Sequence, residues 1–142
     1  AGRWADSGRQ TTLEVLARTH GLPEERILAI ATATFLWMRE HRDLARLTPV
    51  LFQSTAFNQK LKRLQLRTLD TGRNRIREIL KQMRSFKGMS VNSLDSLARS
   101  LHSLIMGSAL YIIGLDEWKQ LDEIEKACQE SLLALLRSQD QR

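Results

Sequence analysis

The stretch LHSLIMGSALYIIGL, residues 101–115, has no charged side chain and is the clearest indicator of fold in this sequence. From Leu104 onward its apolar residues fall on nearly every side of a helix, and such a helix must be covered on every side. The uncharged run is shorter than the roughly 20 residues that a helix needs to cross a bilayer. We therefore predict a buried helix at the centre of a protein core.

The remainder of the sequence also favours helices. Leu, Ala, Arg, Glu, Gln and Lys are abundant, whereas valine occurs only at positions 15, 50 and 91, so strands are not expected. Apolar periodicity and capping residues predict helices at about 11–19, 23–40, 42–53, 56–83, 92–114 and 117–137, with a bend at Pro49. The predicted fold class is all-α, a single helical domain of about six helices.

The domain organisation follows from length and local pattern. A chain of 142 residues suits one hydrophobic core. Residues 1–10 contain Gly2 and Gly8 and show no periodicity, so we expect a disordered or residual linker there and one helical domain over residues 11–142. With no secretory pattern and a single cysteine, Cys128, a cytoplasmic protein without membrane contact is expected.

The last two helices carry more apolar residues than one chain is expected to cover. Gly107 and Ser108 would allow a partner helix to approach closely, and two helices from each subunit would form a four-helix interface with twofold symmetry. We predict a homodimer through these helices. The predicted interface residues are Leu97, Leu101, Leu104, Ile105, Ser108, Ile124, Cys128, Leu132 and Leu135.

The residue types that carry most enzyme chemistry are sparse. The one cysteine and three histidines, His20, His41 and His102, lie in separate elements without metal-ligand spacing. No glycine-rich phosphate loop or nucleophile elbow occurs. We expect a binding protein rather than an enzyme, with no metal and no cofactor.

Two stretches resemble the effector domain of TetR-type transcriptional repressors. The first runs from Leu22-Pro23-Glu24-Glu25-Arg26 through Glu40-His41-Arg42-Asp43-Leu44, and it is similar to a helix of that family and the corner after it, with Arg42 in place of the usual proline. The second is Leu97-Ala98-Arg99-Ser100-Leu101 through Gly107, which is similar to the family's penultimate helix. The resemblance extends over residues 11–137.

The resemblance implies a ligand-binding and dimerisation domain. In that family a small molecule enters a pocket among the helices and changes the spacing of two DNA-binding domains across a dimer. The family's N-terminal DNA-reading domain has no counterpart in this sequence, so DNA would be contacted only through a domain outside it. The expected effector is a small apolar or amphipathic molecule.

The apolar stripe of the predicted helix at residues 56–83 is interrupted, and this interruption suggests where the ligand pocket lies. The stripe thins to small and polar residues at Thr68, Thr71 and Gly72, where a core would leave space or admit a polar group. An apolar effector with one polar handle would meet His102, Thr68 or Tyr111, and an anionic one could use Arg73, Arg75 and Arg77. The candidate ligand-binding residues are Trp37, Phe52, Phe57, Thr68, Met83, Phe86, His102, Met106 and Tyr111.

Two other functions remain open. The run Leu101–Ala109 resembles the motif of histidine phosphotransfer domains, which implies a phosphate relay through His102, although Met106 replaces the family's lysine and the glycine lies one position later. Residues 60–87 hold ten Lys or Arg against two acidic residues, within a net charge of +6 for the chain. That block is either a solvated helix face or a surface for nucleic acid or acidic partners, formed by Lys60, Lys62, Arg63, Arg67, Arg73, Arg75, Arg77 and Lys81.

Overall fold

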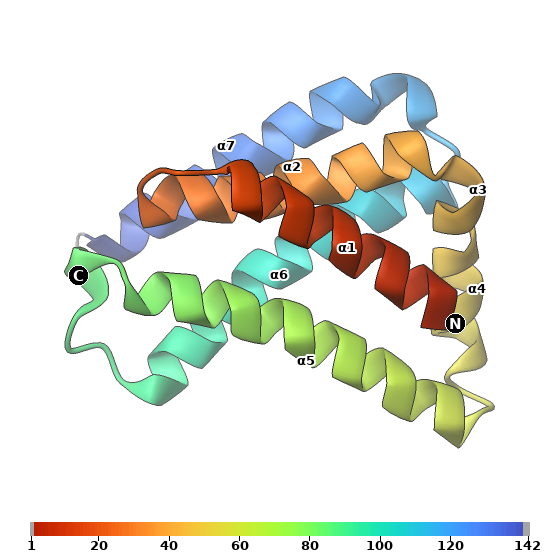
Figure 1. Cartoon of the computed structure of the whole chain (residues 1–142), viewed down its shortest axis with the longest axis horizontal. Helices are drawn as coiled ribbons and strands as arrows, with labels where there is room; N and C mark the ends of the chain where they lie inside the picture. Colours follow the sequence, from red (N-terminus) through yellow and green to blue (C-terminus); the bar gives the residue numbers. More distant parts are fainter. Residues whose placement is uncertain (1, 141–142) are drawn as a thin grey trace.

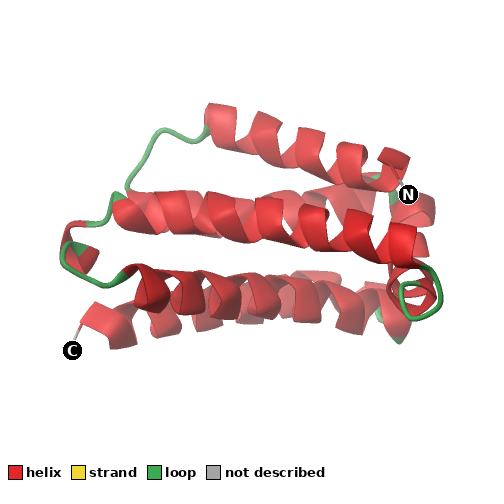
Figure 2. Ribbon diagram, turned by 90° about the horizontal axis from the view of Figure 1, so that it is seen from below, coloured by secondary structure: helices red, strands yellow, loops and turns green. Residues whose placement is uncertain are grey.

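The computed structural model describes residues 2–140, and all regular structure within that range is helical (Figures 1 and 2). The all-α prediction is confirmed. The elements are α1 (Gly2–Arg18), α2 (Pro23–Glu40), α3 (Arg42–Ala45), α4 (Leu47–Ser54), α5 (Gln59–Lys81), the 3-10 turn η1 (Arg84–Phe86), α6 (Val91–Gly114), the 3-10 turn η2 (Trp118–Gln120) and α7 (Leu121–Asp140).

Helix α1 corrects the prediction of a linker at residues 1–10. The helix already begins at Gly2, and Trp4 is buried with 8% of its surface exposed. The Nε1 of Trp4 donates a hydrogen bond to Thr48 Oγ1 at 2.9 Å, and Trp37 Nε1 donates to Ser7 Oγ at 2.9 Å. These long-range contacts order a segment whose own sequence shows no apolar period, because tertiary packing supplies the stability that local pattern lacks. Residue 1 lies outside the described range.

The two prolines act where backbone chemistry predicts. Pro23 begins α2, where its missing N–H costs nothing, and Glu24 and Glu25 follow in the first turn, where acidic groups favour the helix dipole. The predicted bend at Pro49 appears as a break at Arg46, which separates α3 from α4. Proline lacks the N–H that would bond to the carbonyl four residues earlier and its ring crowds that carbonyl, which belongs to Ala45. The break therefore lies one turn before the proline.

Side-chain caps start the two longest helices. Asn58 accepts a hydrogen bond from the Leu61 N–H at 3.0 Å at the start of α5, and Ser90 accepts one from the Ser93 N–H at 3.1 Å at the start of α6. With Ser90 as its cap, α6 begins at Val91, slightly earlier than the predicted start at residue 92. Helix α5 in turn is shorter at both ends than its predicted span of 56–83.

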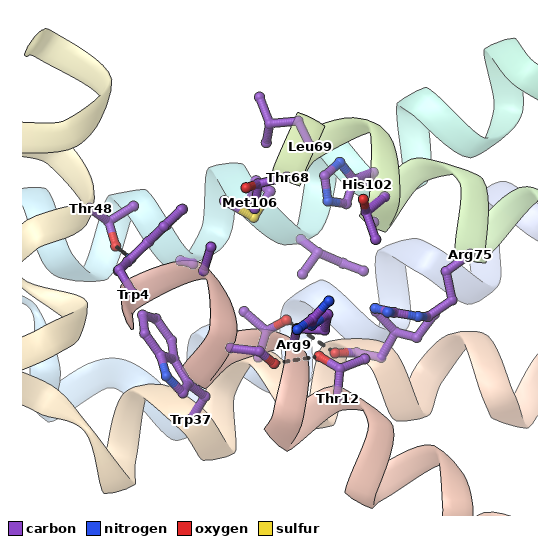
Figure 3. A pocket seen from close by; sticks show the side chains of 18 of the residues that line it. Trp4, Arg9, Thr12, Trp37, Thr48, Thr68, Leu69, Arg75, His102 and Met106 are labelled. Atoms are coloured by element: carbon purple, nitrogen blue, oxygen red, sulfur yellow. Dashed lines mark hydrogen bonds between the residues drawn. The ribbon is translucent and has the colours of Figure 1, made fainter. Parts of the chain in front are cut away.

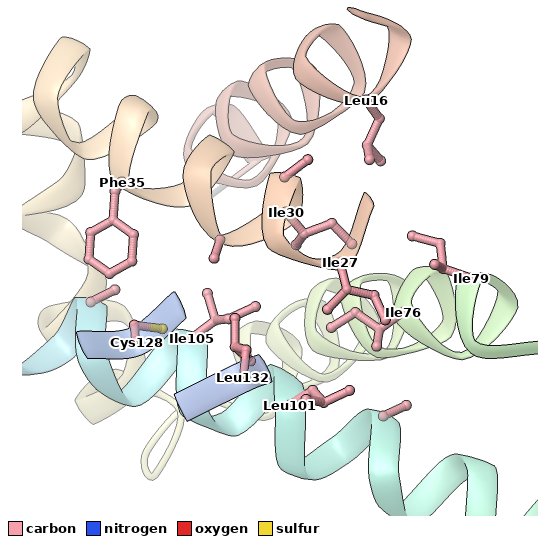
Figure 4. Close-up of a cluster of buried hydrophobic side chains, with 14 of the residues drawn as sticks. Leu16, Ile27, Ile30, Phe35, Ile76, Ile79, Leu101, Ile105, Cys128 and Leu132 are labelled. Atoms are coloured by element: carbon pink, nitrogen blue, oxygen red, sulfur yellow. The ribbon is translucent and has the colours of Figure 1, made fainter. Parts of the chain in front are cut away.

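Helix α6 is the central helix of the core. It packs against α5 and α7, and Leu101, Ile105 and Ile112 are almost fully buried among side chains from α2, α5 and α7 (Figure 4). At 24 residues, it is long and apolar enough to pass a length-and-composition test for a membrane span. Four other helices cover one face of it. Ser103, Gly107 and Tyr111 are exposed, so the uncharged stretch lies in the core along one face and is not covered on every side as predicted.

The predicted dimer residues divide into two groups. Five of them are buried within one chain and belong to its own core, namely Leu97, Leu101, Ile105, Cys128 and Leu132. The other four are half-buried, namely Leu104, Ser108, Ile124 and Leu135. Apolar residues at helical spacing indicate that a face is covered but not what covers it, so the predicted interface is corrected at the five core positions.

Candidate functional site

A cavity of about 310 Å³ lies among α1, α2, α4, α5 and α6 (Figure 3). Its size is at the lower end of the range for small-molecule sites. The lining residues with exposed side chains are Asp6 and Arg9 from α1 and Arg67 and Thr71 from α5. The cavity therefore opens to solvent between α1 and α5. Figure 1 shows where these two helices lie in the bundle.

The apolar part of the lining comes from four helices, with Leu64 and Leu69 contributed by α5. Helix α6 contributes Ile105, Met106, Ala109 and Ile113, and the facing surface contains Ile30 and Trp37 of α2 with Trp4 and Ala5 of α1. The rings of Trp4 and Trp37 meet edge to face, with centroids 6.4 Å apart. These side chains form a wall that suits the apolar body of a ligand.

The thinned stripe of α5 borders the cavity, as the sequence predicted. Thr68, Thr71 and Gly72 all line it. Gly72 has a specific reason to be glycine, because a Cβ there would lie 2.6 Å from Nε2 of His102 on α6. The missing side chain makes the space in which the imidazole sits.

The imidazole of His102 is uncharged near neutral pH. Burial lowers its pKa below the ordinary value of 6.5, and the positive charges of Arg73 and Arg75 lower it further. The ring therefore offers the cavity one N–H donor and one acceptor nitrogen rather than a charge.

Three arginines surround the cavity, at positions 9, 67 and 75, against one acidic residue, Asp6. Arg9 is 3.3 Å from Asp6, but Arg75 forms no ion pair within the described part of the chain. Burial lowers the pKa of Arg75, and repulsion from Arg9 adds to the effect. With His102 uncharged, the lining carries a net charge of +2.

Most neutral side-chain hydrogen-bond donors of the lining are already engaged. The hydroxyls of Thr12, Thr34, Thr68 and Thr71 each donate to the backbone carbonyl one turn earlier in their own helix, and the two indole N–H groups bond to Thr48 and Ser7. Among the described lining residues, the side-chain donors that remain for a ligand are therefore the guanidinium groups, His102 and the hydroxyl of Thr48, which accepts from Trp4 but donates to no protein atom.

Four of the nine predicted ligand-binding residues line the cavity, namely Trp37, Thr68, His102 and Met106. The other five do not. Phe57 is 90% exposed and Tyr111 is 53% exposed, whereas Met83 and Phe86 are buried in the core and Phe52 is half-buried. We predicted these five because their side chains are large or aromatic. The prediction was wrong for them because the direction in which a side chain points depends on how its helix is rotated in the bundle.

Sequence reasoning missed the contribution of α1 and α4. Trp4, Arg9, Thr12 and Thr48 all line the cavity, and two of them, Trp4 and Arg9, belong to the segment predicted to be a linker. A tryptophan at position 4 was the available indicator, because a large aromatic residue rarely occurs in a disordered tail. Of the Arg73, Arg75 and Arg77 cluster, only Arg75 reaches the cavity.

The surroundings of His102 also bear on the predicted phosphotransfer, and the distribution of ligating side chains bears on metal binding. His102 is half-buried on the cavity side, under Gly72, instead of standing on an open face. Within the described residues, no three His, Cys, Asp or Glu side chains cluster in a way that could hold a metal ion. Phosphotransfer through His102 stays a prediction.

Comparisons of the chain with protein-family models, with curated proteins and with solved structures find no match.

Proposed function

We propose that this chain is the ligand-sensing and dimerisation domain of a TetR-like transcriptional regulator and that it acts in the cytoplasm. The observation that carries the proposal is the cavity of about 310 Å³ among five helices, with an apolar wall and a basic rim. A small amphipathic effector fits that lining. DNA would be bound by a domain outside this sequence.

The helix order supports the proposed family. Helix α2 begins at Pro23 and ends at Glu40, and α3 starts immediately after the corner at His41. This is the helix and corner that the resemblance implies. The last two long helices, α6 and α7, pack on each other, as the resemblance also implies.

The outer face of α6 and α7 supports a dimer. Exposed residues at helical spacing on α6 are small, namely Ser96, Ser100, Ser103 and Gly107, and those on α7 are Ala127, Ser131, Ala134 and Ser138. Small residues let the helices of a partner approach closely. The half-buried Leu104, Ile124 and Leu135 lie beside these stripes and would complete their burial in a second copy.

Ligand sensing requires that the cavity change shape between two states. The cavity opens between α1 and α5, which belong to different parts of the bundle, since α1 packs on α2 and α5 packs on α6. An effector that contacts both helices at once would favour one spacing between them. It shifts the equilibrium only to the extent that it binds that spacing more tightly.

Native mass spectrometry of protein purified without added ligand tests the dimerisation part of the proposal. We expect a dimer, and Gly107→Arg should convert it to a monomer of unchanged helicity. A Cβ at Gly107 meets no atom within 4 Å, so the arginine harms the interface and not the fold. Asn74→Arg, on the exposed side of α5, is the matched control. A wild-type monomer at micromolar concentration would refute the dimer.

A further inference from the structure

We propose that the effector is an anionic amphiphile, held with its acidic headgroup on Arg75 and Arg9 and its apolar body on the wall formed by α2 and α6. This inference rests on the proposed function, because it names the ligand class of the same cavity. Figure 3 shows both guanidinium groups at one end of the lining, with Trp37 and Met106 further along it.

The pairing of neighbouring arginines on α5 singles out Arg75. Arg73 and Arg77 are one turn apart and both lie 3.6 Å from the carboxylate of Asp95 on α6. Each also has an acidic partner on α5, because Asp70 lies 2.9 Å from Arg73 and Glu78 lies 4.0 Å from Arg77. Arg75 lies between them in sequence and therefore points to the opposite side of the helix, toward the cavity. No acid among the described residues pairs with it.

The guanidinium of Arg9 adds a second positive charge near Arg75, which strengthens the case for a bound anion. Arg9 on α1 is close enough to lower the pKa of Arg75 by repulsion, and its own carboxylate partner, Asp6, is exposed. Arg75 is half-buried without an acidic partner among the described residues, whereas Arg9 is exposed. An anion between them would relieve their mutual repulsion and the desolvation of Arg75. A carboxylate or phosphate can accept hydrogen bonds from both guanidinium groups, which bind such groups in a fork geometry.

The rest of the lining selects against other ligand classes. Most tryptophan and threonine donors of the lining are engaged within the protein, so a neutral polar ligand finds two uncharged side-chain donors among the described lining residues, His102 and the hydroxyl of Thr48. A cationic ligand would meet a net charge of +2. A small inorganic anion would leave the wall of Ile105, Met106 and Trp37 uncovered.

Calorimetric titration with matched probes tests the inference. Decanoate, decanol and decyltrimethylammonium share one chain and differ in headgroup charge, and acetate supplies the headgroup alone. At neutral pH we expect decanoate to bind at least tenfold more tightly than decanol, a difference of about 1.4 kcal/mol. The cationic probe and acetate should bind more weakly than decanol. Because decanol is the more apolar of the first two probes, a preference for decanoate reports the charge.

Two variants locate the headgroup. Arg75→Gln should remove most of the preference for decanoate while leaving the Kd of decanol within about twofold, since a charge-assisted hydrogen bond contributes roughly tenfold or more. Arg63→Gln makes the same change in charge on the exposed side of α5, outside the cavity, and should leave both affinities unchanged. Circular dichroism confirms that each variant is folded.

The outcomes separate this inference from the proposed function. If decanol binds but decanoate is not preferred, or if Arg75→Gln and Arg63→Gln have equal effects, the anionic headgroup site is refuted while the amphiphile cavity stands. If none of the three chain-bearing probes binds, the cavity is not an amphiphile site and both proposals fail. The wild-type comparison decides the headgroup preference even if Arg75→Gln does not fold.

Discussion

The contact between Gly72 and His102 gives the most quantitative prediction, through the substitution Gly72→Ala. An added Cβ would lie 2.6 Å from Nε2 and 3.3 Å from Cδ2 and Cε1 of the imidazole. Alanine in place of glycine inside a helix stabilises by about 1 kcal/mol. Overpacking costs about 1–3 kcal/mol. Gly72→Ala alone should therefore range from neutral to about 2 kcal/mol destabilising.

A double-mutant cycle isolates the contact. In the His102→Ala background the imidazole is gone, so Gly72→Ala should stabilise by about 1 kcal/mol. The coupling free energy between the two substitutions is then about 1–3 kcal/mol, well above the few tenths expected for independent sites. Gly8→Ala is the matched control, because a Cβ there meets no atom within 4 Å and should stabilise equally in both backgrounds.

Urea unfolding followed by far-ultraviolet circular dichroism measures all of these values. The m-value has to stay constant across the variants, so that changes in midpoint report stability alone. If Gly72→Ala stabilises by the same amount with and without His102, the close contact does not exist. The view that this glycine makes room for the imidazole would then be refuted.

Three further predictions concern pH, a buried hydrogen bond and the core. Because the pKa of His102 is lowered on folding, the unfolded chain binds its proton more readily, so thermal stability should decline as the pH falls from about 6.5 toward the lowered pKa, and His102→Ala should flatten that decline. Trp4→Phe removes the bond to Thr48, which is 2% exposed, and should cost about 1–3 kcal/mol in urea unfolding; Trp118→Phe, whose indole N–H has no partner among the described residues, should cost less. Leu132→Ala, at a side chain with no exposed surface, should cost about 2–5 kcal/mol, and a loss below 1 kcal/mol would contradict its place in the core.

Local sequence determined the helices and several of their ends. Pro23 with its two acidic neighbours started α2 as predicted, and the uncharged run from Leu101 supplies a buried face of α6. The polar interruption at Thr68 and Gly72 correctly indicated where α5 borders a space. These features depend on backbone chemistry and on the periodicity of a single helix, which neighbouring residues are sufficient to encode.

The rotation and pairing of the helices were decided only by tertiary structure. Residues 2–10 are helical because long-range contacts stabilise them, such as the hydrogen bond from Trp4 to Thr48, which lies 44 positions away. Asp95 of α6 pairs with Arg73 and Arg77 but not with Arg75, which points to another side of α5 and is left without an acidic partner among the described residues. Leu101 and Leu132 are buried by other helices of the same chain rather than by a second copy. A helical pattern states which residues share a face, whereas the partner of that face depends on contacts between segments far apart in sequence.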